Sequence, residues 1–327
     1  MRHRLDCMHP VPSQLQHRPF TRDQALAAGV TKKMLEGSRF VPVYRGVWRH
    51  RHHEMTPEDW VIAARLALPS QAHLTGISRL QQLGLDFGPR LPVRFVVEGE
   101  LHLAFENVFL HRTKRLAPTD ATGVVPAAAF IAYCARARVL DAIKVGDWLL
   151  HEGHVSAEEI RTLALAGLWR DGADEALWIL DHLDGRARSL KESEIRAILC
   201  FAGLPTPEVN GPVIVGEGDT VIGDLVYRAW RTVVEYEGKH HQELRSQYES
   251  DIDRYAAMRA AGTRYVQITQ ERLHRPRAAV AAVYRTLAAA GYDGPPPVFG
   301  VRWQLLFAAV STAVGPRRNR ERRSAVG

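Results

Sequence analysis

The stretch TVVEYEGKHH, residues 232–241, places charged side chains at the end of an apolar run. In an extended chain alternate side chains share one face, so Glu235, Glu237 and Lys239 would project together from a strand that begins in a core. Two carboxylates held this close cost stability unless a cation, a proton or a lysine lies between them. The pattern fits a built site, and it also fits a strand that leaves the core for a solvated turn at Gly238.

The chain has 327 residues, a length that favours two or three domains. Its net charge is +7, but the final stretch PRRNRERRSAVG carries five Arg and one Glu, so most of the excess lies in those last residues. The rest of the chain is only mildly basic, which permits a nucleic-acid partner without requiring one.

Cysteine usage and hydropathy indicate the compartment. Cys7, Cys134 and Cys200 are odd in number and widely scattered, which argues against a disulfide framework or a zinc site and suits a reducing environment. No secretory signal is evident, and the apolar residues 305–314 form too short a run to cross a bilayer. We therefore expect a cytoplasmic protein with no membrane partner.

The first structured region begins at Phe20 and has the order helix, turn, short helix and β-ribbon. Thr21 and Thr31 are N-cap residues for FTRDQALAAGV and TKKMLEGSRF, and FVPVYRGVWRHR alternates like two short strands. This order is typical of a winged helix-turn-helix, whose second helix enters a major groove. Its candidate DNA contacts are Thr31, Lys32, Lys33, Arg39, Arg45 and Arg49, for which a solvated face is the structural alternative.

The same region resembles the N-terminal winged-helix domain of type IV abortive-infection antitoxins. The resemblance rests on FTRDQALAAGV and VYRGVW and covers roughly thirty residues. It implies a module that binds DNA or serves only as an interaction domain, and it leaves a toxin partner open.

The pattern beyond this region gives a mixed fold class: a winged helix (α+β), a helical middle region and a C-terminal α/β mixed sheet. DHLDGRARS, residues 181–189, is the best candidate for a linker. The expected divisions are an N-terminal arm 1–19, a winged helix 20–55, an α+β extension 56–117, a helical connector 118–185, a nuclease-like domain 186–292, and a C-terminal helix with a basic tail 293–327.

Residues 190–241 hold the candidate chemistry. LKESEIRAILCF is a helix that carries Glu192, and two apolar strands follow, the second with Asp224. In a meander, Asp224 and Glu235 lie on neighbouring strands, where partners sit about 5 Å apart. That separation suits one divalent ion, and Mg²⁺ (or Mn²⁺) prefers such oxygen ligands.

Each acidic residue then has a candidate role. Asp224 and Glu235 would hold the metal, Glu237 with Lys239 or His241 would position and deprotonate a water, and Glu192 would act through water. Structural alternatives stay open: Glu192 as a first-turn carboxylate favoured by the helix dipole, Asp224 in a bulge, and the histidines in a turn.

Residues 189–273 resemble the PD-(D/E)xK restriction-endonuclease-like superfamily, in particular an uncharacterised actinobacterial domain akin to very-short-patch-repair endonucleases. The matching pieces, in order, are Glu192-Ser193, Arg196, AGLPTPEVN, Asp224, VVEYEGKHH, Asp251, Arg254, Gly262 and YVQITQERL. The resemblance implies a mixed sheet flanked by helices with the acidic cluster at its edge. It makes Glu235 the principal carboxylate, puts Glu237 in the usual lysine's place, and gives that lysine's duties to His241, with His240 as a second candidate. Glu237 departs from the Asp that relatives most often carry.

The sequence therefore predicts a metal-dependent DNA endonuclease that hydrolyses phosphodiester bonds and is targeted by a winged helix. The alternative is a non-catalytic DNA-binding regulator or antitoxin-like protein with a degenerate nuclease fold. A third reading is an interaction module with neither activity. Whether two chains pair as a homodimer stays open.

Overall fold

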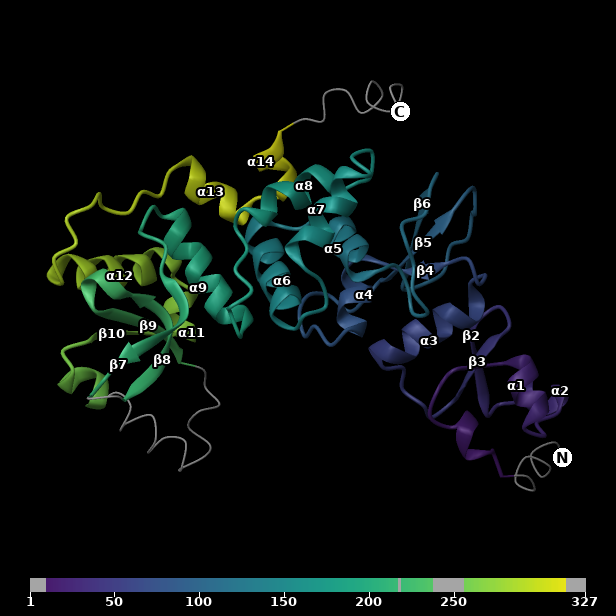
Figure 1. Ribbon diagram of the computed structural model, residues 1–327. Coiled ribbons are helices and arrows are strands. Elements are labelled where there is room, and N and C mark those ends of the chain that lie inside the picture. The colour runs from purple at the N-terminus through teal and green to yellow at the C-terminus, as the bar shows by residue number, and fades with distance from the viewer. Residues whose placement is uncertain (1–9, 217–218, 238–255, 316–327) are drawn as a thin grey trace. The chain divides into compact units, whose positions relative to one another are not determined.

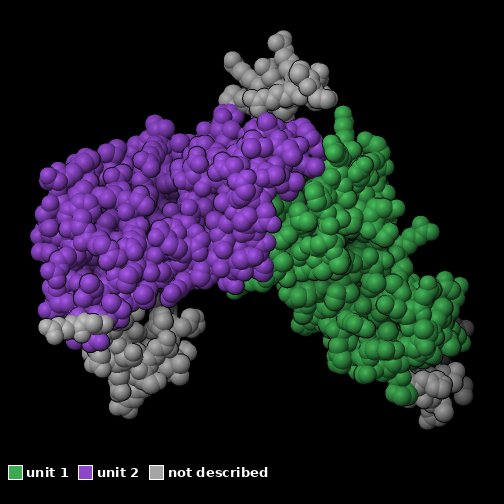
Figure 2. Space-filling model, in the orientation of Figure 1, with its two compact units in different colours: residues 1–129 green, residues 130–327 purple. Residues whose placement is uncertain are grey.

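The computed structural model describes residues 10–216, 219–237 and 256–315. The chain divides into two compact units, residues 1–129 and 130–327, which Figure 2 shows in different colours. The class is mixed, with helices and sheets in both units (Figure 1). Among the residues described, no helix is long and apolar enough to span a membrane.

The first part of unit 1 contains the helices and the β-ribbon expected after Phe20. Thr21 closes a capping box with Gln24, Thr31 accepts a hydrogen bond from the Met34 amide, and Gly46 turns the ribbon with a φ of 85°. A small antiparallel sheet has the order β1-β3-β2. The elements are η1 (Ser13–Leu15), β1 (Phe20–Thr21), α1 (Arg22–Ala27), α2 (Lys32–Leu35), β2 (Phe40–Tyr44) and β3 (Val47–His50).

A second small sheet completes unit 1, with the order β4-β5-β6 and a parallel β5–β6 pair. Thr56 caps the helix that begins at Pro57, and its hydroxyl accepts a hydrogen bond from the Asp59 amide. The buried Arg79 guanidinium donates to Val124 O at 3.1 Å and to Asp120 at 2.6 Å. These bonds tie the last residues of unit 1 to the helix that carries Arg79. The elements are α3 (Pro57–Ala67), β4 (His73–Leu74), α4 (Gly76–Gln82), β5 (Val93–Glu98) and β6 (Val108–Thr113).

From residue 130 onward the helical middle region belongs to the same compact unit as the C-terminal sheet, and its helix Val139–His151 packs against the helix Leu190–Phe201. The expected linker, residues 181–189, does not separate two units, because the Asp184 amide donates to Asp147 at 2.7 Å and Arg196 pairs with Asp147 at 2.7 Å. These contacts join helices distant in sequence. The helices are α5 (Pro126–Cys134), α6 (Val139–His151), α7 (Ala157–Leu165), α8 (Ala173–Leu180), α13 (Val301–Phe307) and α14 (Val310–Val314).

The C-terminal sheet has the order β10-β9-β8-β7, antiparallel from β7 to β9 and parallel between β9 and β10. Helix α9 contacts β8 and β9, and α12 contacts β9 and β10 (Figure 1). Residues 256–260 are helical and place Met258 against Val226 and Val233. The elements are α9 (Leu190–Phe201), β7 (Glu208–Ile214), β8 (Thr220–Tyr227), η2 (Arg228–Trp230), β9 (Thr232–Glu237), β10 (Arg264–Thr269), α11 (Gln270–Leu273) and α12 (Pro276–Ala289).

Candidate functional site

Strands β8 and β9 separate at the point where the acidic residues lie. Their ladder ends with the pair Leu225–Val234; beyond it β8 pairs with β7, while β9 continues beside β10. Asp224 is the next residue of β8, and Glu235 the next of β9. We call this place the strand fork, defined by Asp224 and Glu235. The predicted meander is present, and it puts the two carboxylate residues on neighbouring strands.

The Asp224 side chain bridges the strand fork. Its Oδ2 accepts a hydrogen bond from the Tyr236 amide at 3.0 Å, in place of a backbone carbonyl. A carboxylate that accepts from a backbone amide forms a charge-assisted bond with a fixed direction. Asp224 is thereby held beside the peptide that follows Glu235, in partly exposed surroundings.

Glu235 is the most buried carboxylate of the fork. Its side chain belongs to a residue only 4% exposed, and Oε2 accepts a bond from the Tyr265 hydroxyl at 3.4 Å. Tyr265 lies on β10, two residue pairs before Glu235–Gln267 in the parallel ladder. A buried carboxylate needs hydrogen bonds or a cation, since water no longer stabilises its charge. Glu237 ends β9 and is half-buried.

Glu192 is a brace between α9 and β7. It is 7% exposed, and its Oε2 accepts from the Arg188 amide at 2.9 Å and from Asn210 Nδ2 at 2.7 Å. Its own amide donates to the N-cap Ser189 at 3.1 Å. Glu192 therefore has the structural role of a first-turn carboxylate that the sequence left open. Its position in the first turn is only part of the reason, because it also binds Asn210 of β7.

Asn210 is a residue to which the sequence patterns gave no role. It has a positive φ of 50° and lies between the pairs Val209–Leu225 and Gly211–Gly223, so it faces Asp224 across the β7–β8 ladder. The left-handed region is one that Asn adopts more readily than most residues. The only signal in the sequence was its place at the end of AGLPTPEVN.

The remaining predicted catalytic residues, Lys239 and His241, lie outside the described residues, as do His240, Asp251 and Arg254. Within the residues that are described, no group of three or more His, Cys, Asp or Glu side chains could hold a metal ion. Two carboxylates nevertheless suit Mg²⁺, which keeps several waters and commonly takes one or two carboxylate ligands. Asp224 and Glu235 therefore fit such an ion by their donor chemistry and their adjacent strands.

The candidate DNA contacts in unit 1 fall into two groups. Lys32, Lys33 and Arg45 are exposed, with Lys32 Nζ 4.0 Å from Glu36. Thr31 is exposed, and its hydroxyl accepts from the Met34 amide at 3.3 Å. These four residues sit at the start of α2 and at the ribbon turn, the positions the winged-helix interpretation requires.

Arg49 and Arg39 are partly buried and differ from that expectation. Arg49 Nη1 donates to three carbonyls, at 3.2 Å to His50, 3.0 Å to Arg51 and 2.6 Å to His53. Arg51 in turn donates its amide to Arg39 O at 2.8 Å. The Arg49 side chain thus stabilises the turn that follows β3, because a long guanidinium can fold back on its own backbone.

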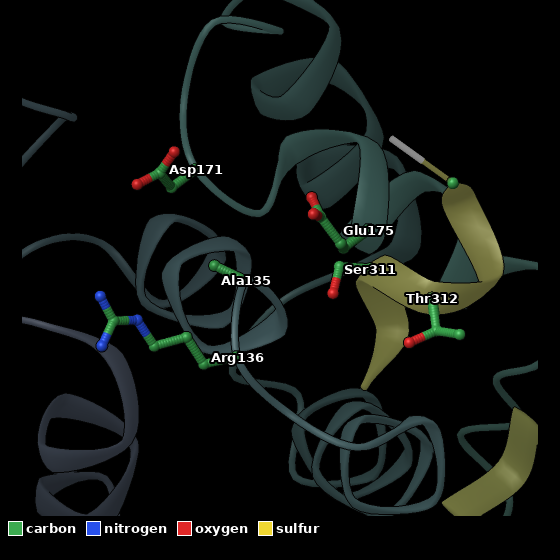
Figure 3. Close-up of a pocket in the computed structure, with 7 residues that line it drawn as sticks. Ala135, Arg136, Asp171, Glu175, Ser311 and Thr312 are labelled. Carbon is green, nitrogen blue, oxygen red and sulfur yellow. The ribbon is translucent and has the colours of Figure 1, made fainter. Parts of the chain in front are cut away.

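Unit 2 also contains a polar pocket away from the strand fork, with a volume of about 620 Å³. Figure 3 shows Arg136 and Asp171 on one side of it and Ser311 and Thr312, from α14, on the other. The two acidic residues Asp171 and Glu175 face the single cation of Arg136, so charge alone selects no ligand class. None of its lining residues belongs to the sheet.

Comparisons with known proteins give similarity without an activity. No protein-family model matches the chain, and no solved structure matches it significantly. Two uncharacterized proteins, from two strains of Mycobacterium tuberculosis, are each 28% identical to it over 136 residues. The match covers 42% of this chain and 50% of each relative, so the chain spans half the length of these relatives.

Proposed function

We propose that this chain is a metal-dependent DNA endonuclease of the restriction-endonuclease-like kind, directed to DNA by a winged helix. The observation that carries the proposal is the strand fork, where Asp224 bonds to the Tyr236 amide beside the buried Glu235. Acidic residues at the separation of two sheet strands offer oxygen ligands from one partly exposed and one buried carboxylate. This is the arrangement that metal-assisted hydrolysis of a phosphodiester needs.

Asp224 and Glu235 would hold the ion, which when bound acts as a Lewis acid on the scissile phosphate. The protein's own part is to fix those ligands. The Tyr236 amide orients Asp224, and the Tyr265 hydroxyl orients Glu235. Glu237, which ends β9, would accept a proton from an attacking water.

Unit 1 would supply the affinity for DNA. Lys32 and Lys33 begin a short helix on the exposed side, and Arg45 lies at the ribbon turn. Such exposed cations bind phosphates without reading base sequence. Binding through them should therefore weaken steeply as salt rises.

Asp224→Ala is the direct test of cleavage. Purified protein should nick supercoiled plasmid in Mg²⁺ or Mn²⁺, and the variant should lose at least about a hundredfold of that rate because an oriented metal ligand is gone. Agarose electrophoresis of the plasmid forms over time provides the measurement, with single-stranded DNA assayed in parallel.

Glu158→Ala is a matched control, since it removes an exposed carboxylate on α7 in the same unit. It should cleave like the unsubstituted protein. Equal nicking by the unsubstituted protein and Asp224→Ala would point to a contaminating nuclease. Absence of nicking with every metal would contradict the proposed activity.

A second function, a DNA-binding regulator without cleavage, is favoured by one observation. Both Glu192 and Asp224 already accept hydrogen bonds from backbone amides, which is how carboxylates brace a structure. Calorimetry separates the two functions. Salt-sensitive DNA binding without Mg²⁺ or Mn²⁺ uptake would support the regulator.

A further inference from the structure

The segment before α9 is hydrogen-bonded to Asn210 of β7, which lies opposite Asp224 in the register of the β7–β8 ladder. Asn210 Nδ2 donates to Arg186 O at 2.7 Å and to Glu192 at 2.7 Å, while the Arg188 amide donates to Glu192 at 2.9 Å. Asn210 faces Asp224 across the β7–β8 ladder. The backbone of residues 186–188 is therefore fixed to the same polar residues that adjoin the fork.

Lys191 extends this connection from the first turn of α9. Its Nζ lies 6.0 Å from the ring centroid of Tyr236, the residue whose amide binds Asp224. The same amine donates to Glu194 Oε2 at 3.0 Å. A cation thus lies beside the strand that carries Glu235, and it is held there by contacts on both sides.

Lys191 shares its carboxylate partner with a second lysine. Glu194 Oε2 also accepts from Lys144, at 3.1 Å, so two ammonium groups share one carboxylate oxygen. The Lys144 side chain is 9% exposed, whereas that of Lys191 is 37% exposed. Lys191 is therefore the more exposed of the two ammonium groups.

Arg188 adds a second exposed cation on the same segment. Arg186 is different, because its guanidinium pairs with Asp184 at 2.7 Å. Asp224, Glu235 and Glu237 make the fork itself acidic, so a polyanion approaching it would be repelled without nearby cations. Arg188 and Lys191, which we call the α9 rim, are placed to offset that repulsion.

We infer that the α9 rim binds the phosphate backbone of a nucleic acid strand and holds it at the strand fork. The inference rests on the proposed function for the identity of that strand. Arg188 and Lys191 each neutralise one phosphate, and the contact is independent of base sequence. The rim thereby places a phosphodiester beside Asp224 and Glu235 before any chemistry occurs.

Salt dependence of binding is the decisive measurement. The full-length protein is titrated into a short fluorescent DNA duplex in EDTA, at a series of salt concentrations between about 50 and 200 mM. Arg188→Ala and Lys191→Ala should each reduce the slope of log K against log salt by about 0.9, and the double variant by about twice that. Arg188→Lys and Lys191→Arg should keep the original slope, because they keep the charge.

Arg161→Ala is the matched control, because it removes one charge from α7 and the Arg161 side chain is 45% exposed. Its slope should not change. Thermal midpoints of all variants, measured alongside, detect any loss of folding. A slope change in Arg161→Ala equal to that in the rim variants would overturn the inference, since it would report only net charge.

Cleavage assays on the same variants separate this inference from the proposed activity. If the unsubstituted protein cuts DNA and both rim variants keep the slope of log K against log salt, the nuclease proposal stands and the inference about the α9 rim is refuted. If the protein never cuts DNA but the slope falls in both rim variants, the nuclease proposal is refuted and the inference about the α9 rim is supported. Unchanged slopes together with no cleavage would overturn both.

Discussion

Asp147 is a carboxylate with no exposed surface, and it shows how one residue can decide the stability of unit 2. Its Oδ2 pairs with Arg196 at 2.7 Å and its Oδ1 accepts from the Asp184 amide at 2.7 Å. Burial raises the pKa of Asp147, and the nearby Arg196 guanidinium opposes that rise. Removing the arginine should leave a charge with nothing to balance it.

Arg196→Met should destabilise the protein by about 3–5 kcal/mol at neutral pH, the range found when one partner of a buried pair is removed. A raised folded-state pKa means that protonated Asp147 favours folding, and this contribution is lost as pH rises through that pKa. The destabilisation caused by Arg196→Met should therefore be smaller at about pH 5, where Asp147 takes up a proton more readily, than at about pH 7.5. Urea unfolding at both pH values measures it, and an equal loss at each would contradict the explanation.

Residue identities in the strand fork were predictable only in part. Glu235 follows from an apolar strand that ends in acids and Asp224 from its place within the preceding strand, and the structure places them on adjacent strands. The brace of Glu192 with Asn210 was not predictable, because it depends on an Asn in the left-handed region that meets a helix from elsewhere in the chain. Hydrogen bonds between distant segments leave no local pattern.

Helix α9 is the element that joins the two parts of unit 2. It contacts α6 on one side and strands β8 and β9 on the other. Its hydroxyl cap, Ser189, is predictable from sequence, since serine before a helix satisfies an otherwise unpaired amide. Which elements the helix touches follows from packing alone.

Ser189→Ala should lower the free energy of unfolding by about 1 kcal/mol, because the Glu192 amide loses its acceptor. Ser189→Gly should cost only a few tenths of a kcal/mol, since glycine exposes the helix end to water. Chemical denaturation of both variants is the measurement. No loss of stability in Ser189→Ala would show that the hydroxyl does not act as a cap.

The expected linker at residues 181–189 illustrates an error at the scale of elements. Gly, Asp and Arg in DHLDGRARS are typical of an exposed connection. In the structure Ala187 is buried and Asp184 bonds to α6, so the segment is short but packed. Composition reports local turn preference, whereas packing depends on the partner surface.

The whole molecule has two compact units with separate cores, divided at residues 129 and 130. Separate cores unfold as separate cooperative transitions when little couples them. We expect calorimetry of the full chain to resolve two transitions. Arg196→Met should lower only one midpoint, and Arg79→Met only the other, because Arg79 bridges α4 to Asp120 and Val124 within unit 1.

A single transition that both variants shift equally would contradict two independent units. The two substituted arginines are also buried to a similar extent. Arg79 is 4% exposed and Arg196 is 6% exposed, so each variant removes a buried cation of similar burial from a different unit. The two substitutions are therefore matched in chemistry and differ in location.

The sequence by itself determined the local elements: capped helices after Thr21, Thr31 and Thr56, a ribbon turning at Gly46, and apolar strands ending in acids. These depend on neighbours along the chain, so periodicity and capping residues reveal them. Only the tertiary structure decided that residues 130–185 share a compact unit with the C-terminal sheet, that Asn210 and Glu192 brace α9, and that Arg49 folds back on its own turn. Those outcomes depend on contacts between segments distant in sequence, whose burial and hydrogen bonds exist only after folding.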